Sequence, residues 1–234
     1  MKTKKIIFIV SLAGLLGAIW PFSWLISHPN PESPGTKAWL DKETSILESV
    51  SSNLDPKVLR LSLVAYMKAR KEGYDTKQML TIIDYSKPST ARRLWVFDLK
   101  NGRELFNTWV SHGKNSGDVM ANSFSNSPGS LKSSLGVFVT EQTYMGGHGL
   151  SLRIKGLEQG INDNALSRDI VFHGAPYVDG QTAQRYGRIG RSWGCPAVST
   201  STIHSLVETI KDQTVVFAYY PDRHWLNSST FLSG

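Results

Sequence analysis

Short strand-like segments separated by turn residues dominate the chain from about Thr81 onward, and they restrict the folds that it can adopt. RLWVFDL (93–99) is typical of a strand, and Asn101-Gly102 predicts a hairpin turn into the next segment. Four further segments have the same character, namely SSLGVFVTEQTYMG (133–146), LSLRIKGL (150–157), RDIVFHGA (168–175) and TVVFAYY (214–220). STSTIHSLVETIKDQ (199–213) predicts one amphipathic helix. Residues 81–222 therefore predict a β-rich α+β domain with a curved, barrel-like or sandwich sheet.

A helical segment is predicted over residues 37–80, in front of this domain. Asp55 suits the N-cap position, Pro56 suits the first helical position, and Gly73 is suited to end the helix. A broad apolar face lies between them, so we expect this helix to pack on the sheet.

The N-terminus predicts export from the cytoplasm. MKTKK precedes an uncharged apolar run, Ile6–Ile26, whose 21 residues span about 30 Å as a helix. Residues 1–27 therefore predict an uncleaved signal anchor in the inner membrane, with a cleaved signal peptide as the alternative. Proline-rich residues 28–36 predict a linker, and residues 223–234 predict a polar tail. The domain is then expected to be periplasmic.

The charge pattern gives no reason to expect a nucleic-acid partner. The formal net charge is +7, but Lys2, Lys4 and Lys5 supply part of it, and no Lys/Arg block occurs elsewhere.

Cys195 is the only cysteine of the chain and lies in the glycine-containing segment GRSWGCPAV (190–198). A lone cysteine is most often a small buried apolar residue, but an unpaired thiol in an oxidising compartment suggests chemistry. A thiol with an ordinary pKa of about 8.5 needs a base or a cation beside it to become nucleophilic. His173, at the end of the strand DIVFHGA, is the first candidate for that base.

Two other histidines compete with His173 for the role of base. His112 follows a strand in WVSHG, and His148 lies in the glycine turn MGGHG. No spacing typical of zinc ligands joins these histidines, so no metal or other cofactor is expected.

The residues around Cys195 suggest further roles. The backbone amides of Gly194 and Cys195 are candidates for an oxyanion hole. Arg188 and Arg191 are either solvated or able to anchor a carboxylate, and Trp193 either stacks on the substrate or packs in the core.

Several motifs occur in the order found in the murein L,D-transpeptidase catalytic domain family. They are FSN (124–126), GSLKSSLG (129–136), HGLSLR (148–153), GLEQGIN (156–162), HGAPYV (173–178) and GRSWGCPAV (190–198). The chain thus resembles this family over roughly residues 80–220. The resemblance implies a cysteine enzyme of peptidoglycan cross-linking or remodelling that uses no metal.

The resemblance also implies roles for individual residues. Cys195 is the nucleophile, His173 is its base, and the Gly174 carbonyl orients the imidazole. Cys195 would form a thioester with a donor stem peptide and pass the acyl group to an amine. The residues expected to contact the substrate are Tyr144, His148, Arg191, Ser192 and Trp193. Inhibition by carbapenems is expected on the same basis.

Two positions depart from the usual family signature. Trp193 replaces a second histidine, and Ala197 replaces an asparagine or arginine. Two alternatives therefore remain: an L,D-carboxypeptidase that hydrolyses the same thioester, and a non-catalytic, membrane-tethered murein-binding protein. Sortase-like and NlpC/P60-like enzymes fit less well, because their arginine spacing or residue order differs.

Overall fold

The computed structural model describes residues 34–51 and 53–233. The predicted anchor (1–27) and most of the predicted linker (28–36) lie outside these residues. Within the described part, no helix is long and apolar enough to cross a membrane.

Two helices precede the sheet in the described residues, where the sequence predicts one helical segment over residues 37–80; Met79 and Leu80, at the end of that segment, belong to the first strand instead. They are α1 (Lys37–Val50) and α2 (Pro56–Lys71), and both contact the sheet. The carboxylate of Asp55 accepts a hydrogen bond from the amide of Lys57 and so caps α2. Pro56 begins that helix, and Gly73 follows its end with a φ of 86°.

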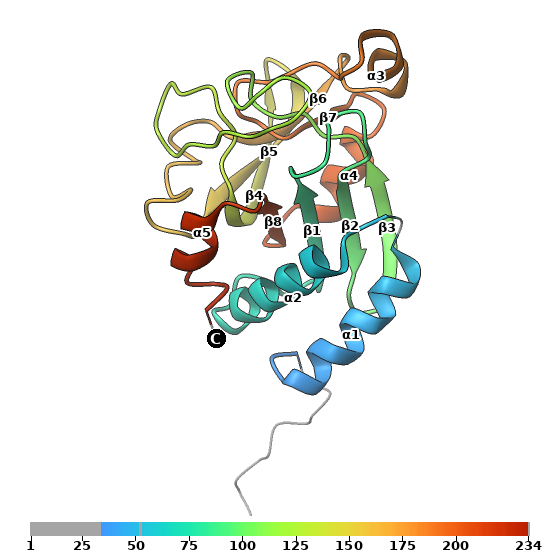
Figure 1. The fold of residues 1–234 in the computed structure, drawn as a ribbon, viewed down its shortest axis with the longest axis vertical. Helices are drawn as coiled ribbons and strands as arrows, with labels where there is room; N and C mark the ends of the chain where they lie inside the picture. The colour runs from blue at the N-terminus through green and yellow to red at the C-terminus, as the bar shows by residue number, and fades with distance from the viewer. Residues whose placement is uncertain (1–33, 52, 234) are drawn as a thin grey trace, which may run out of the picture. The chain divides into compact units, whose positions relative to one another are not determined.

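Eight strands form one mixed sheet in the order β3-β2-β1-β8-β4-β5-β6-β7 (Figure 1). Their bounds are β1 (Met79–Asp84), β2 (Leu94–Asp98), β3 (Arg103–Thr108), β4 (Gly136–Gly146), β5 (Gly149–Gly156), β6 (Val171–Ala175), β7 (Ala197–Ser199) and β8 (Val215–Tyr219). Two strand pairs, β1–β8 and β6–β7, are parallel, and the other pairs are antiparallel. The predicted β-rich α+β fold with few helices is confirmed.

The segment after β3 brings the two ends of the sheet together. The amide of Ser111 donates to the carbonyl of Ala197 in β7 at 2.8 Å. Two residues later, Gly113 pairs with Ser192 in a parallel bridge. The sheet is therefore nearly closed into a barrel, and the closure runs beside the Cys195 loop.

Helix α4 (Ile203–Ile210) covers one face of the sheet, where it contacts β5 and β6. A Cβ on Gly174 would lie 2.9 Å from the side chain of Ile203, so glycine permits this close packing.

Residues 223–234 do not form the polar tail that the sequence predicts. Helix α5 (Arg223–Ser228) begins there, and the side chain of Trp225 is 2 % exposed. Its indole N–H donates to the carboxylate of Glu158 at 3.2 Å. The Glu158 carboxylate also accepts the amide of Val137 at the start of β4. The prediction failed because one buried tryptophan outweighs the polar residues around it.

Replacing Trp225 by alanine should destabilise the whole domain. The change empties a buried aromatic site and removes a donor from a buried carboxylate, so we expect the free energy of unfolding to fall by about 3–5 kcal/mol. Urea denaturation followed by circular dichroism measures this. The matched control is His224→Ala, an exposed neighbour that should change little; an equal effect of both changes would contradict the assignment.

Candidate active site

Parallel pairing of β6 with β7 brings His173 and Cys195 onto adjacent segments. His173 pairs with Ala197, which follows Cys195 by two residues. The thiol of Cys195 lies beside the start of β6, where it donates to the carbonyl of Asp169 at 3.4 Å. Asp169 adopts a left-handed φ of 54° immediately before the strand. The sheet thus places His173 and Cys195 on adjacent segments, with the thiol at the level of Asp169 and Val171, and no hydrogen bond joins the two side chains among the described residues.

The imidazole of His173 is held in one tautomer. Its Nδ1 lies 3.0 Å from the carbonyl oxygen of Gly174, the contact that the family resemblance implies. A carbonyl only accepts, so Nδ1 carries the hydrogen and Nε2 keeps its lone pair. Burial lowers the pKa of His173, so the ring is neutral at neutral pH. A neutral imidazole with a free Nε2 lone pair is suited to accept a proton.

Two further predicted residues come from β4 and from the turn between β4 and β5, and one of them, His148, contacts His173. The exposed ring of His148 stacks on the His173 ring, with centroids 4.4 Å apart and planes inclined by 22°. Tyr144 of β4 pairs with Ser151 of β5, which in turn pairs with His173. The guanidinium of Arg153 lies over the Tyr144 ring at 4.4 Å. The structure therefore brings Tyr144 and His148 to the His173 side of the site.

The thiol of Cys195 is half-buried, and this burial raises its pKa. The amide of Val171 and the guanidinium of Arg168 act in the opposite direction. At neutral pH the thiol is thus protonated. Its ionisation has to accompany the reaction and is not a property of the resting site.

A side-chain hydroxyl shapes the turn that carries the thiol. Ser192 Oγ accepts the amide of Gly194 at 3.1 Å and donates to the carbonyl of Cys195 at 2.6 Å. This corrects the expectation that the Gly194 amide points at an oxyanion, because that amide is already bonded within the turn. Among the described residues, the Cys195 amide has no hydrogen-bond partner, and it is the donor left for such a role.

Gly194 has a structural requirement of its own. Its φ is 129°, and a Cβ there would lie 2.8 Å from the carbonyl oxygen of Lys132 and 2.9 Å from the side chain of Ile170. A side chain would therefore strike the protein interior, so the glycine lets the turn seat on the domain.

Two buried serines hold the turn through hydrogen bonds to its backbone. Ser111 Oγ accepts the amide of Ala197 at 3.2 Å and lies 3.4 Å from the Cys195 carbonyl, to which it donates. Ser133 Oγ donates to the carbonyl of Gly194 and accepts the amide of Gly113. Sequence reasoning missed both serines, because their role depends on contacts between distant segments.

His112 does not share the site with Cys195 as a second base. It is completely buried, and Nη2 of Arg93 donates to its Nδ1 at 2.7 Å. Burial, followed by the charge of Arg93, lowers the pKa of His112 to about 4. The ring is neutral, and its Nδ1 already accepts a hydrogen bond from the Arg93 guanidinium, so the role of His112 is structural.

The two arginines near the cysteine loop are already engaged. Nε of Arg188 lies 2.9 Å from the Asp118 carboxylate, and Arg191 lies 3.4 Å from the same group. Nη1 of Arg191 also donates to the carbonyl of Gly117 at 2.8 Å. Arg191 therefore holds residues 114–118 in place. Anchoring of a substrate carboxylate by Arg191 would have to coexist with these contacts.

Trp193 is 73 % exposed, beside the nucleophile turn. The ammonium of Lys114 lies 5.8 Å from its ring centroid. The possibility that Trp193 packs in the core is wrong, and an exposed indole ring is left available for stacking.

Arg168 is a third residue that the sequence reasoning missed. Its guanidinium is the cation that acts on Cys195, although it lies five residues before His173 in SRDIVFHG. Alternation along that strand gave no reason to select it.

The described residues contain no group of three or more His, Cys, Asp or Glu placed to hold a metal ion.

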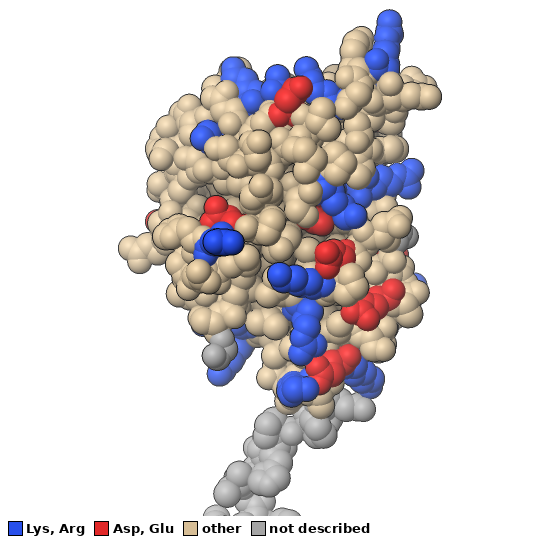
Figure 2. Space-filling view, in the orientation of Figure 1, with Lys and Arg blue, Asp and Glu red and all other residues tan. Residues whose placement is uncertain are grey.

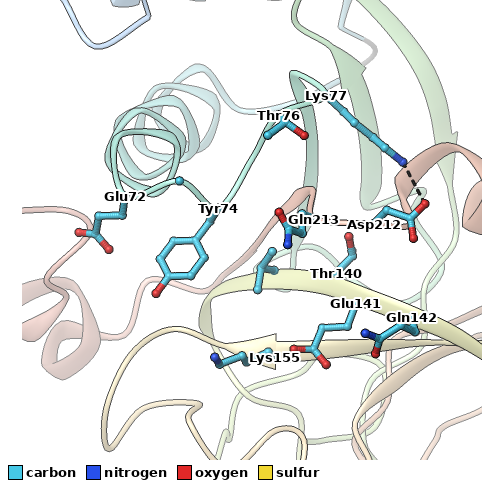
Figure 3. Close-up of a pocket in the computed structure, with 12 residues that line it drawn as sticks. Glu72, Tyr74, Thr76, Lys77, Thr140, Glu141, Gln142, Lys155, Asp212 and Gln213 are labelled. Atoms are coloured by element: carbon cyan, nitrogen blue, oxygen red, sulfur yellow. Dashed lines mark hydrogen bonds and ion pairs between the residues drawn. The ribbon is translucent and has the colours of Figure 1, made fainter.

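A groove of about 640 Å³ lies away from Cys195 and His173, between the segment after α2, strands β4 and β5, and the turn before β8 (Figure 3). Lys77 and Asp212 form an ion pair at its edge. Several Lys and Arg side chains project from the upper edge of the visible face in Figure 2, while acidic and basic side chains intermingle below.

Comparison with known proteins identifies a relationship for most of the chain. A family model described as "L,D-transpeptidase catalytic domain" matches residues 50–219. No curated protein matches the chain.

Solved structures with a similar arrangement include three L,D-transpeptidases. The enzyme from Mycobacterium smegmatis is 13 % identical, with a TM-score of 0.38, over 61 % of this chain and 59 % of that chain. One in complex with imipenem is 14 % identical, with a TM-score of 0.38 and the same coverage. The enzyme from Stackebrandtia nassauensis is 14 % identical, with a TM-score of 0.37, over 79 % of this chain and 92 % of that chain. The match thus spans about three-fifths of the length of the first two.

The buried His112 predicts a specific pH dependence of stability. Its pKa is about 4 in the folded protein and 6.5 ordinarily, so the unfolded chain takes up the proton first as pH falls. The stabilisation is fully present above pH 6.5 and is lost toward pH 4, by up to about 3 kcal/mol. Urea titrations of His112→Gln should show a flatter pH dependence than the parent over this window. An unchanged slope, with His224→Gln as control, would show that another group is responsible.

Proposed function

The chain belongs to the family of L,D-transpeptidase catalytic domains, and on this premise we propose that it is a cysteine acyltransferase acting on peptidoglycan stem peptides. This is the family that its sequence motifs resemble. The observation that carries the proposal is the placement of the single cysteine beside the strand that presents His173 in the Nε2-accepting tautomer.

In the proposed first step, the sulfur of Cys195 attacks a peptide carbonyl of the donor stem. Its proton passes to Nε2 of His173, while Nδ1–H keeps its bond to Gly174. To reach the imidazole, the thiol leaves the Asp169 carbonyl that it now faces. The Cys195 amide faces the developing oxyanion. The imidazolium then protonates the departing amine of the terminal residue, which leaves a thioester.

In the second step, an amine from a neighbouring stem attacks the thioester. His173 accepts the proton of this amine, the carbon–sulfur bond breaks, and the thiolate is reprotonated. A new amide bond, and hence a cross-link, is the product. Hydrolysis of the same thioester by water makes the protein an L,D-carboxypeptidase. The partly exposed thiol admits either acceptor.

The proposal includes a place in the cell. We propose that the domain acts outside the cytoplasm, held at the inner membrane by residues 1–27. The lysines that precede the apolar run Ile6–Ile26 support this orientation.

Acylation by a carbapenem tests the proposed nucleophile. We expect the mass of the protein to increase by one drug molecule, because a strained β-lactam carbonyl accepts the same thiol attack. The adduct should be absent from Cys195→Ala and formed at least about 100-fold more slowly in His173→Ala, which lacks the base. Intact-protein mass spectrometry measures both.

Two results would count against this function. Failure of the parent protein to acylate, together with no turnover of muropeptides, favours the non-catalytic murein-binding alternative. An adduct that persists in Cys195→Ala assigns the chemistry to another group.

A second prediction concerns Trp193 as a stacking surface for the substrate. Trp193→Ala should raise KM for muropeptides roughly five- to tenfold, the equivalent of about 1 kcal/mol of ring stacking, with little change in kcat. Because the side chain is exposed, the free energy of unfolding should change by less than about 0.5 kcal/mol. Steady-state kinetics and urea denaturation together distinguish this from a packing role, which would lower stability.

A further inference from the structure

We propose that Arg168 is a positioning residue whose guanidinium supplies the counter-charge for the Cys195 thiolate, and that the motifs FSN (124–126) and GSLKSSLG (129–136) hold it in place. The inference rests on the proposed function, in which Cys195 is the nucleophile. It assigns a role to a residue that is not part of the His-Cys pair.

Four oxygen atoms from these two motifs surround the guanidinium. Nη1 of Arg168 donates to the carbonyl of Ser125 at 2.7 Å and to Ser134 Oγ at 2.5 Å. Nη2 donates to the carbonyl of Lys132 at 2.7 Å and to Ser130 Oγ at 3.2 Å. These bonds use all four hydrogens of the two terminal nitrogens. The fork is therefore fixed and has no terminal donor left to bind a substrate carboxylate.

All four acceptors are neutral, so the charge of Arg168 is not compensated. The neighbouring arginines differ, since Arg153, Arg188 and Arg191 each face a carboxylate. Among the described residues, Arg168 forms no ion pair and is only partly exposed. Burial lowers its pKa, and Cys195 is the group that acts in the opposite direction. A half-buried cation without an acid is costly unless an anion forms beside it.

The nucleophile turn sits directly on this cation. A Cβ on Gly194 would lie 3.5 Å from Nη2 of Arg168 and 2.8 Å from the Lys132 carbonyl that binds the same nitrogen. The absence of a side chain thus lets the backbone next to Cys195 approach the guanidinium. The guanidinium therefore lies on the protein side of the turn, against the residue that precedes Cys195.

The arrangement explains how the site works with Trp193 in the position of a second histidine. When the Cys195 proton passes to Nε2 of His173, negative charge develops on the sulfur. Arg168 keeps its own protons and stabilises that charge by electrostatic attraction through the turn. No second titratable ring is needed next to the nucleophile.

The pKa of the thiol itself is the appropriate measurement. Cys195 is the only cysteine, so the rate of alkylation of the full-length chain by iodoacetamide, followed against pH in neutral detergent, reports this thiol alone. Arg168→Gln should raise the thiol pKa by about 1 or more. The pH profile of kcat/KM should move to higher pH by the same amount. Arg168→Lys, which keeps the charge, should stay closer to the parent even if its melting temperature falls.

Arg103→Gln is the matched control, because it removes the same charge from an exposed arginine that pairs with Asp98 on the β2–β3 hairpin. It should leave the thiol pKa unchanged. The proposal is overturned if Arg168→Gln keeps the parent thiol pKa, or if folded Arg168→Lys raises it as much as the neutral change does. Should Arg168→Gln not fold, the proposal is overturned if folded Arg168→Lys raises the thiol pKa by about 1 or more. Alkylation needs no turnover, so a shifted thiol pKa in a protein that carbapenems do not acylate refutes the enzyme function but not this electrostatic role.

Discussion

The parallel ladder between β6 and β7 is the interaction on which the site depends. It sets His173 against Ala197 and so places the turn ending in Cys195 beside the start of β6. Strand β7 has only three residues, and a strand that short cannot hold a register by itself. Hydrogen bonds from Ser111 and the bridge between Gly113 and Ser192 hold its other side. The chemistry therefore relies on a strand fixed from both edges.

The guanidinium groups of Arg93, which is buried, and Arg168, which is half-buried, support the segments around Cys195 in different ways. Arg93 is completely buried, and it donates to backbone carbonyls and to His112 on the inner side of the closing segment. Burial, together with the charge of Arg93, keeps that imidazole neutral and makes it a structural acceptor. Arg168 has only neutral acceptors too, but it lies under the nucleophile turn. One cation thus supports a contact between segments of the fold, whereas the other lies against the turn that carries Cys195.

The sequence predicted those features that depend on neighbouring residues. The strands and the cap at Asp55 follow from local patterns, whereas the bond between His173 and the adjacent Gly174 carbonyl was implied by the family resemblance. Features that require distant segments were missed or misjudged. Spacing alone left His112 as a competing base, because nothing in WVSHG shows that Arg93 donates a hydrogen bond to its imidazole. The prediction that the Gly194 amide is an oxyanion donor is wrong, because that amide donates to Ser192 Oγ. The predicted tail forms a helix instead, because Trp225 is buried and donates a hydrogen bond to Glu158, 67 residues earlier.

Closure of the sheet has a consequence for the order in which the molecule assembles. The bonds that join Ser111 to Ala197 span 86 residues, so the chain between them is largely in place before they form. Contacts of such long sequence separation carry a large loop-closure cost and form late in folding. Cys195 therefore reaches its final surroundings only after most of the domain has folded.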